Sequence, residues 1–304
     1  MTTDIVCLLN EGSELLARRG VEAARTEAVL LLAFALGKPK EYVFLESQRS
    51  VTPEQERIYR EALARRARRV PYAYIVGSRE FMGLDFCVNE AVLIPRPETE
   101  TLVETVLAQK QLFGQGARLT AQGETDAEHS ITHALGDGVS LLDLCTGSGA
   151  VAIALAVNWR ELTCVVGTDV SQEALEVARG NARRLGVSAL WRQGDLWEAV
   201  GEGEVFDCIT ANPPYISDGD YRMCGPEVHC EPRAALWGGM DGLEFYRRIA
   251  AEAADHLKTG GRMYLEIGWQ QGRSVCKVLE HAGFRAEVFR DLGDRDRVVV
   301  GRKV

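Results

Sequence analysis

From Val139 to the end of the chain, seven short apolar runs typical of strands alternate with segments typical of amphipathic helices. This alternation predicts a parallel sheet with helices on both faces. A short Leu-Gly-Asp turn joins the last two runs, which predicts a terminal antiparallel pair. The expected fold class is therefore α/β, with a doubly wound, mostly parallel, seven-stranded sheet. The strand-like runs are residues 139–145, 163–169, 189–195, 205–211, 261–268, 285–291 and 296–303.

The segment before this alternation has a different character. Residues 1–78 carry apolar residues at helical spacing without a strand pattern, so we expect a small helical bundle. Thr52, Pro53 and Gln55 predict a helix start with a capping box, and Pro71 predicts the end of that helix. Residues 79–97 suggest a β-hairpin linker, and residues 98–304 form the expected third part of the chain.

Composition excludes several classes of function. A net charge of −9 argues against a general nucleic-acid binder, and no apolar run approaches the length of a membrane span. The N-terminus lacks a basic, signal-like region, so we expect a cytoplasmic protein, and we expect a monomer. The eight cysteines are scattered, which predicts free thiols and no metal site. His129 and His133 are four residues apart, but we interpret them as solvated residues of a polar segment, 114–138.

A glycine-rich turn follows the first strand of the alternation. Gly147 and Gly149 allow the backbone to approach a ligand, and the next helix offers free N–H groups. The turn lacks the Gly-Lys-Ser/Thr ending of a phosphate-binding loop, and Ala152 stands where the dinucleotide pattern has its third glycine. Asp143 before the turn disfavours a pyrophosphate and suits a ligand with positive charge. S-adenosylmethionine, with an amine and a sulfonium, meets that requirement.

Two further acids end the next two strands. Asp169 is placed to accept hydrogen bonds from ribose hydroxyls, and Asp195 to accept one from an adenine amino group. The apolar neighbours Leu196 and Trp197 could cover the adenine ring. The alternative interpretation of both acids is helix capping, which Ser171 could provide in place of Asp169.

The fourth strand ends in Asn212-Pro213-Pro214-Tyr215. In a doubly wound sheet this strand lies beside the first, so the motif and the glycine turn should face one pocket. The Asn212 side-chain oxygen and the Pro213 carbonyl can each accept one N–H of a planar amino group. Tyr215 can pack on the planar face, and the two prolines stiffen the chain. A rigid turn without a ligand is the alternative.

These residues resemble the Asn/Asp-Pro-Pro-Tyr amino-methyltransferases, which use S-adenosylmethionine. Residues 77–89, 92–100 and 230–249 narrow the resemblance to the bacterial peptide chain release factor glutamine N5-methyltransferases. The resemblance covers the whole chain and implies a class I, Rossmann-like methyltransferase. It further implies methylation of the glutamine in the Gly-Gly-Gln loop of class-1 peptide chain release factors, with no stable nucleic-acid or membrane partner.

The resemblance also assigns site residues. The cofactor loop maps to Cys145, Thr146, Gly147, Ser148 and Gly149, the ribose acid to Asp169, and the adenine-side contact to Leu196 or Trp197. The glutamine clamp maps to Asn212, Pro213, Pro214 and Tyr215. Arg96 and Glu98 become candidates for the substrate side, with hinge packing or a surface ion pair as the alternative.

Two features depart from the family pattern. Cys145 stands where the family often has glycine, and segment 114–138 is longer than usual. The arginine-rich run 64–69 could contact a release factor or the ribosome, or form a solvated helix face. The rival functions are a glutamine methyltransferase for a ribosomal protein, an adenine-N6 methyltransferase and a non-catalytic binding protein.

Overall fold

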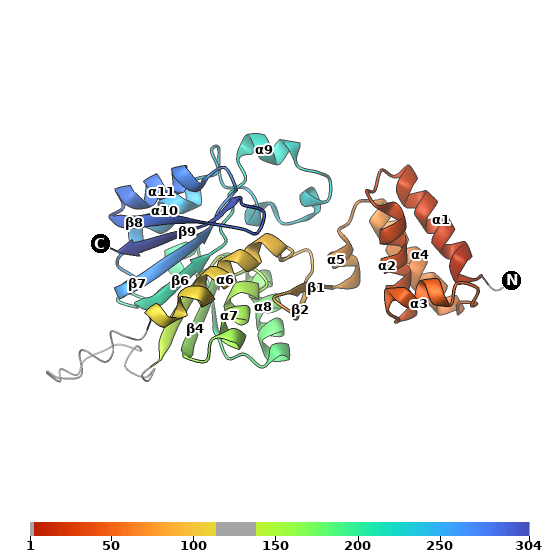
Figure 1. Cartoon of the computed structure of the whole chain (residues 1–304), viewed down its shortest axis with the longest axis horizontal. Coiled ribbons are helices and arrows are strands. Elements are labelled where there is room, and N and C mark those ends of the chain that lie inside the picture. The colour runs from red at the N-terminus through yellow and green to blue at the C-terminus, as the bar shows by residue number, and fades with distance from the viewer. Residues whose placement is uncertain (1–2, 114–137, 304) are drawn as a thin grey trace. The chain divides into compact units, whose positions relative to one another are not determined.

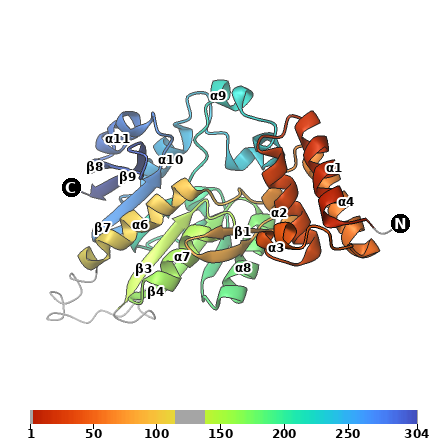
Figure 2. The same ribbon diagram turned by 45° about the vertical axis from the view of Figure 1, so that its right-hand side comes forward.

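The computed structural model describes residues 3–113 and 138–303. The chain divides into two compact units, residues 1–78 with 225–230 and residues 79–224 with 231–304, and each is described by itself (Figures 1 and 2). His129 and His133, and nearly all of the polar segment 114–138, lie outside the described residues. Within residues 3–113 and 138–303, no helix combines the length and the apolar character needed to cross a membrane.

The first unit is helical, as expected. Thr52 and Gln55 form the predicted capping box, with Pro53 in the first helical position. The helix that follows ends at Ala67, four residues before Pro71. Leu31, Leu32 and Tyr59 are fully buried in the centre of the bundle. The helices are α1 (Ile5–Arg18), α2 (Ala24–Leu36), α3 (Lys40–Leu45), α4 (Pro53–Ala67) and α5 (Tyr72–Val76).

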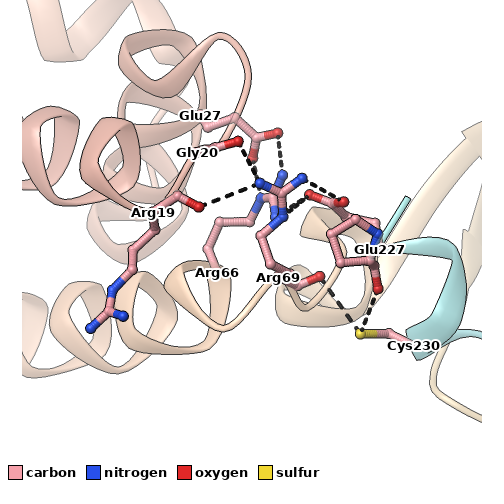
Figure 3. A network of polar contacts seen from close by, with 8 residues as sticks. Arg19, Gly20, Glu27, Arg66, Arg69, Glu227 and Cys230 are labelled. Carbon is pink, nitrogen blue, oxygen red and sulfur yellow. Dashed lines mark hydrogen bonds and ion pairs between the residues drawn. The ribbon is translucent and has the colours of Figure 1, made fainter. Parts of the chain in front are cut away.

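A short segment from late in the chain, residues 225–230, belongs to this helical unit. Figure 3 shows Arg66 of α4 between two carboxylates: it contacts Glu27 at 2.9 Å and Glu227 at 3.0 Å. Arg69 binds Glu227 at 2.7 Å and also donates to the carbonyl of Gly20. Arg66 and Arg69 therefore form neither a solvated helix face nor a free contact surface for a release factor or the ribosome, because both pair with carboxylates inside the unit.

The second unit begins with a hairpin of β1 (Ser78–Phe81) and β2 (Leu84–Cys87). Met82 and Gly83 connect the strands, both with positive φ, as in the tight turns that match strand twist. Phe81 and Phe86 pack edge to face with ring centroids 6.0 Å apart. A hairpin is therefore present at residues 78–87, where the sequence predicted a β-hairpin within residues 79–97.

The main sheet has seven strands in the order β5-β4-β3-β6-β7-β9-β8, and the predicted fold class is confirmed. The strands from β5 to β7 are parallel, whereas β9 lies antiparallel between β7 and β8. The strands are β3 (Val139–Leu144), β4 (Leu162–Asp169), β5 (Leu190–Gln193), β6 (Phe206–Ala211), β7 (Leu257–Glu266), β8 (Phe284–Arg290) and β9 (Asp296–Lys303).

Helices cover both faces of this sheet and create two apolar cores. Leu141 of β3 belongs to the core under α6, α7 and α8, while its neighbour Leu142 belongs to the core under α10 and α11. Successive strand residues point to opposite faces, so β3 contributes to both cores. The helices are α6 (Glu100–Gln109), α7 (Ala150–Asn158), α8 (Gln172–Leu185), α9 (Asp218–Met223), α10 (Glu244–Glu252) and α11 (Gly272–His281). Short 3-10 turns are η1 (Pro97–Thr99), η2 (Lys110–Leu112), η5 (Leu196–Ala199), η6 (Val228–Cys230) and η7 (Arg233–Ala235).

One helix is shorter than its sequence pattern suggests. Residues 242–258 have helical spacing, yet α10 ends at Glu252 and β7 begins at Leu257. Leu257 pairs with Phe206, and the Phe206 N–H donates to the carbonyl of His256 at 2.9 Å. Pairing with β6 therefore overrides the local helical preference at the end of this segment.

Arg66 gives the first prediction. Arg66→Ala should destabilise the helical unit by about 3 kcal/mol, because it leaves the partly buried carboxylate of Glu27 without its cation and Glu227 with Arg69 alone. Hydrogen exchange of the α2 and α4 amides in urea measures this, since all five tryptophans lie outside the unit. Arg57 of the same helix is the control: it is exposed and pairs with Glu54 and Glu61, so Arg57→Ala should cost less than about 1 kcal/mol. Equal losses for the two variants would contradict the role given to Arg66.

Candidate active site

A cavity of about 360 Å³ lies in the second unit at the carboxyl ends of the central strands. Leu144 of β3 pairs with Thr168 of β4 on one side and with Ala211 of β6 on the other. This is the point where strand order reverses, and ligands bind there in open α/β sheets. The glycine turn after β3 and Asn212 after β6 both line the cavity, as the sequence predicted.

The glycine turn has an unusual backbone. Cys145, Gly147 and Gly149 all have positive φ, at 56°, 53° and 79°. The turn is closed by hydrogen bonds from the Thr146 N–H to the Thr168 carbonyl at 2.9 Å and from the Gly149 N–H to the Thr146 carbonyl at 2.8 Å. A side chain at Gly147 would meet no atom within 4 Å, so the backbone there faces open space. At Gly149 a side chain would press on Ile153 and Trp191, so packing also requires glycine.

Asp143 lies beneath the turn and is 1% exposed. Its two carboxylate oxygens accept hydrogen bonds from the hydroxyls of Thr146 at 2.6 Å and Thr210 at 2.7 Å. Burial raises the pKa of Asp143 to about 6, although the two hydroxyls oppose the shift. Asp143 thus links the glycine turn to β6 and brings negative charge to the cavity wall.

Asp169 ends β4 and supports the same turn. One carboxylate oxygen accepts from the Gly147 N–H at 2.9 Å and the other from the Ser171 N–H at 3.0 Å. Ser171 itself caps α8 by accepting from the Ala174 N–H, so Asp169 is not the capping residue. Burial raises the pKa of Asp169. Its remaining lone pairs are available to a ligand in the cavity that it lines.

The third acid, Asp195, has structural partners. It caps η5 through a capping box with Glu198 and forms an ion pair with Arg248 at 2.8 Å. Asp195 therefore has the helix-capping role that the sequence analysis gave as the alternative. It also lines the cavity. Leu196 lines the cavity too, with a φ of 55°. Trp197 does not line the cavity. Its ring stacks on that of His256 with centroids 4.8 Å apart, and its indole N–H donates to the carbonyl of Arg248.

The Asn-Pro-Pro-Tyr segment is held at both ends. The Asn212 side-chain amide donates to the Thr99 hydroxyl at 3.3 Å. The Tyr215 carbonyl accepts from the side chain of Gln271 at 3.0 Å, and the Tyr215 hydroxyl makes a long hydrogen bond of 3.5 Å to Glu266. Both prolines are buried, and Pro214 lines the cavity next to Asn212. Asn212 and Pro214 therefore form a fixed part of the cavity wall, whereas Pro213 and Tyr215 do not line the cavity.

The Leu236–Gly238 stretch packs directly on this segment. Ile216 exchanges backbone hydrogen bonds with Leu236 and Gly238, each at 2.9 Å. A side chain at Gly238 would lie 2.6 Å from the Pro214 carbonyl oxygen and 2.7 Å from the Tyr215 Cα. The close contact requires glycine and explains why a Trp-Gly-Gly sequence accompanies Asn-Pro-Pro-Tyr.

Arg96 and Glu98 differ in their surroundings. Arg96 forms an ion pair with Glu231, a buried carboxylate that also accepts from the Ile94 N–H at 3.1 Å. Glu98 is exposed, and neither side chain lines the cavity. Arg96 is therefore ion-paired, but with a buried carboxylate and not in the surface ion pair given as the alternative.

Three polar residues at this site were missed in the sequence. Thr99 and Gln271 are unremarkable in type, and only their contacts with Asn212 and Tyr215 reveal them. Glu266 had a signal, because it is an acid inside the apolar run 263–267. Acidic residues are almost never fully buried unless they are paired.

The cavity fits S-adenosylmethionine by the chemistry of its lining. Asp143 and Asp169 supply negative charge for an amine, a sulfonium or ribose hydroxyls, while Leu196 and Val170 offer apolar surface. The Thr168 hydroxyl also lines the cavity, is buried, and has no hydrogen-bond partner among the described residues. An unpartnered buried hydroxyl of this kind is expected where a ligand completes the hydrogen bonding.

Comparisons with known proteins identify relatives of this chain. The family described as PrmC N-terminal domain matches residues 8–77, and the methyltransferase small domain matches residues 130–225. A release factor glutamine methyltransferase from Geobacter sulfurreducens is 39% identical, covering 94% of this chain and 92% of its own length. One from Bordetella pertussis is 37% identical, covering 95% and 97%. The solved protein-(glutamine-N5) methyltransferase of Alicyclobacillus acidocaldarius is 27% identical, covering 72% of this chain and 99% of its own, with a TM-score of 0.38.

Asp143 generates a prediction about stability and pH. Because its pKa is raised from 3.8 to about 6, the folded state binds this proton more tightly than the unfolded state. The contribution is therefore most favourable at low pH and is lost as pH rises, by about 3 kcal/mol between roughly pH 4 and 6. Relative to Asp143→Asn, the wild type should lose unfolding free energy over this range. Urea unfolding at each pH measures it, with exposed Asp255→Asn as the control. Identical slopes for wild type and Asp143→Asn would refute the assignment.

Cys145 generates a second prediction, which concerns backbone strain. A left-handed conformation costs a non-glycine residue about 1–2 kcal/mol, and a β-branched residue more. Cys145→Gly removes that strain but also a half-buried thiol, so its unfolding free energy should stay within about 1 kcal/mol of the wild type. Cys145→Val should be the least stable of the three. Thermal unfolding ranks them, and a valine variant as stable as the glycine variant would argue against a strained turn.

Proposed function

The chain belongs to the release factor glutamine methyltransferase family, and from this membership we propose that it methylates a glutamine side chain in its protein substrate. The reaction transfers a methyl group from S-adenosylmethionine to N5 of the glutamine in the Gly-Gly-Gln loop of class-1 peptide chain release factors. A substrate that acts in translation implies work in the cytoplasm. The helical unit, of which residues 8–77 match the PrmC N-terminal domain family, would recognise the substrate.

The residues around the glycine turn would hold the cofactor. Asp169 would accept hydrogen bonds from ribose hydroxyls while it fixes the Gly147 N–H. Leu196 would cover the adenine, and Asp195 would accept from its amino group beside the ion pair with Arg248. Asp143 would favour the positive charge of the ligand. When bound, the cofactor supplies an electrophilic methyl group.

Asn212 and Pro213 would hold the substrate amide. A primary amide is planar and a weak nucleophile, because its nitrogen lone pair is delocalised into the carbonyl. The Asn212 side-chain oxygen and the Pro213 carbonyl would each accept one N–H, which fixes the direction in which the nitrogen points. Holding the nitrogen in reach of the methyl carbon removes most of the entropic part of the barrier. The proton lost from the nitrogen can pass to water.

Tyr215 would define the remaining side of the amide site. Its carbonyl accepts from Gln271 and its hydroxyl lies 3.5 Å from Glu266, and its ring would pack on the planar amide. Burial raises the pKa of Tyr215, so the hydroxyl stays protonated and serves as a donor. Of the two charged candidates for the substrate side, exposed Glu98 is the better placed, since Glu231 occupies Arg96.

The single observation that carries this proposal is the position of Asn212. It lines the same cavity as the glycine turn, Asp143 and Asp169, on a segment held by hydrogen bonds at both ends. A rigid turn with no chemical task would not need an amide in the wall of a cofactor-sized cavity. The arrangement also suits other planar amides, so a ribosomal protein glutamine is the alternative substrate that an experiment must separate.

The prediction is that Asn212→Ala lowers kcat for methylation of a release factor by about 100-fold, the usual cost of losing one fixed polar contact at a reacting group. The assay follows transfer of a labelled methyl group to a release factor that ends its loop in Gly-Gly-Gln. Asn158→Ala is the control, because Asn158 is an exposed asparagine on α7 outside the cavity, and it should leave kcat unchanged.

Three substrates complete the test. No label should be transferred to a release factor with Gly-Gly-Ala in its loop, to duplex DNA, or to an unmethylated ribosomal protein that carries a glutamine methylation site. Label on the ribosomal protein or on DNA, without label on the release factor, would replace the proposed substrate. Full activity of Asn212→Ala on the release factor would remove Asn212 from the reaction.

A further inference from the structure

The Thr99 side chain lies in the wall of the cavity. Thr99 is the last residue of η1 and leads directly into α6 with helical backbone angles, φ −67° and ψ −20°, and its side chain makes no cap hydrogen bond. The side chain lines the cavity, is 4% exposed, and accepts a hydrogen bond from the Asn212 amide at 3.3 Å. The Thr99 hydroxyl therefore has no capping role and is in contact with Asn212.

Glu266 lies behind Thr99. It is the last residue of β7, and because Leu265 pairs with Ala211, Glu266 and Asn212 emerge at the same edge of the sheet. Glu266 is 1% exposed, and its second carboxylate oxygen has no hydrogen-bond partner among the described residues. The Tyr246 hydroxyl fixes its backbone by donating to its carbonyl at 2.9 Å. A buried acid in this setting must serve its neighbours as an acceptor.

Burial raises the pKa of Glu266 to about 7, against the hydrogen bond from Thr99, the nearby charge of Arg297 and the hydrogen bond from Tyr215, while exposed Glu98 adds to the rise. Above pH 7 the carboxyl group is ionised and can only accept hydrogen bonds. The Thr99 hydroxyl, which has a single proton, would then donate it to Glu266. The lone pairs of that oxygen are left for the Asn212 side chain.

This order of donors and acceptors determines which way Asn212 points. An asparagine amide has two ends of nearly equal shape, one an acceptor and one a donor, and only its partners distinguish them. If Thr99 accepts, the NH₂ group of Asn212 must face Thr99. The side-chain oxygen then faces the cavity, where an acceptor is needed for a substrate N–H.

We propose that Thr99 and Glu266 are positioning residues that set the amide orientation of Asn212, so that its oxygen rather than its NH₂ group meets the substrate amide. The inference rests on the proposed function and adds two residues outside the Asn-Pro-Pro-Tyr segment to it. Without the hydroxyl, the Asn212 amide is free to turn over, and its NH₂ group then opposes the NH₂ group of the substrate.

The test is a set of variants assayed at pH 8 with a release factor and labelled cofactor. Thr99→Val keeps the shape and removes the hydroxyl, so kcat should fall at least 10-fold, while Thr99→Ser should retain kcat within 3-fold of the wild type. The cofactor Kd should change less than 3-fold in both variants. Thr105→Val is the matched control: Thr105 is also buried on α6, but its hydroxyl bonds to the Thr101 carbonyl, and kcat should be unchanged.

Glu266→Gln provides a second variant of nearly the same volume. Its amide can donate to the Thr99 hydroxyl as well as accept from it. The direction of the hydrogen bonds from Glu266 through Thr99 to Asn212 is then no longer fixed, and kcat should fall at least 5-fold. Urea unfolding establishes that each variant is folded. The inference is overturned if Thr99→Val keeps kcat within 2-fold of the wild type, if Thr99→Ser is as slow as Thr99→Val, or if the loss appears in the cofactor Kd instead. A wild type that does not methylate the release factor would instead refute the proposed function.

Discussion

The pairing of β3 with β6 is the constraint on which the site depends. Leu144 lies beside Ala211 in this pair, so the chain that leaves β3 as the glycine turn and the chain that leaves β6 as Asn212 diverge from adjacent positions. One side of the resulting gap presents backbone N–H groups and carboxylates suited to a cofactor. The other presents an amide and a carbonyl suited to a substrate. Helices on both faces bury the sheet, which leaves the carboxyl ends of its strands as the place where a ligand can enter.

Two buried carboxylates border this gap, and both have acceptor roles. Asp143 accepts hydrogen bonds from two threonine hydroxyls, and Glu266 accepts a long one from Tyr215, to which the inference above adds one from Thr99. Burial moves the pKa of each toward neutrality, to about 6 and about 7. Strong shifts of this kind are concentrated at functional sites, because an isolated buried charge costs stability that packing elsewhere must offset. In the proposed mechanism, the two acids act mainly by fixing the direction of hydrogen bonds on either side of the reacting groups.

Much of the fold follows from local sequence. The capping box at Thr52, the alternation from Val139 onward and the glycine turn each depend on residues close together in the chain, and each is present as predicted. Features set by distant contacts could not be predicted. Glu227 reaches Arg66 across 161 positions, and α10 stops early because Leu257 pairs with Phe206. Leu196 rather than Trp197 lines the cavity because a left-handed residue at 196 begins the short η5 turn and directs the indole to His256. The contact of Thr99 could not be predicted either, because nothing in the neighbouring sequence indicates that its hydroxyl accepts from the Asn212 amide.

The central claim is that Asn212 and Pro213 hold the glutamine amide with two acceptors. The most direct measurement is a crystal structure with S-adenosylhomocysteine and a peptide that contains Gly-Gly-Gln. The account predicts that the glutamine side-chain nitrogen lies about 3 Å from both the Asn212 side-chain oxygen and the Pro213 carbonyl oxygen. A glutamine bound elsewhere in the cavity, or an Asn212 side chain whose NH₂ group faces the peptide, would contradict it.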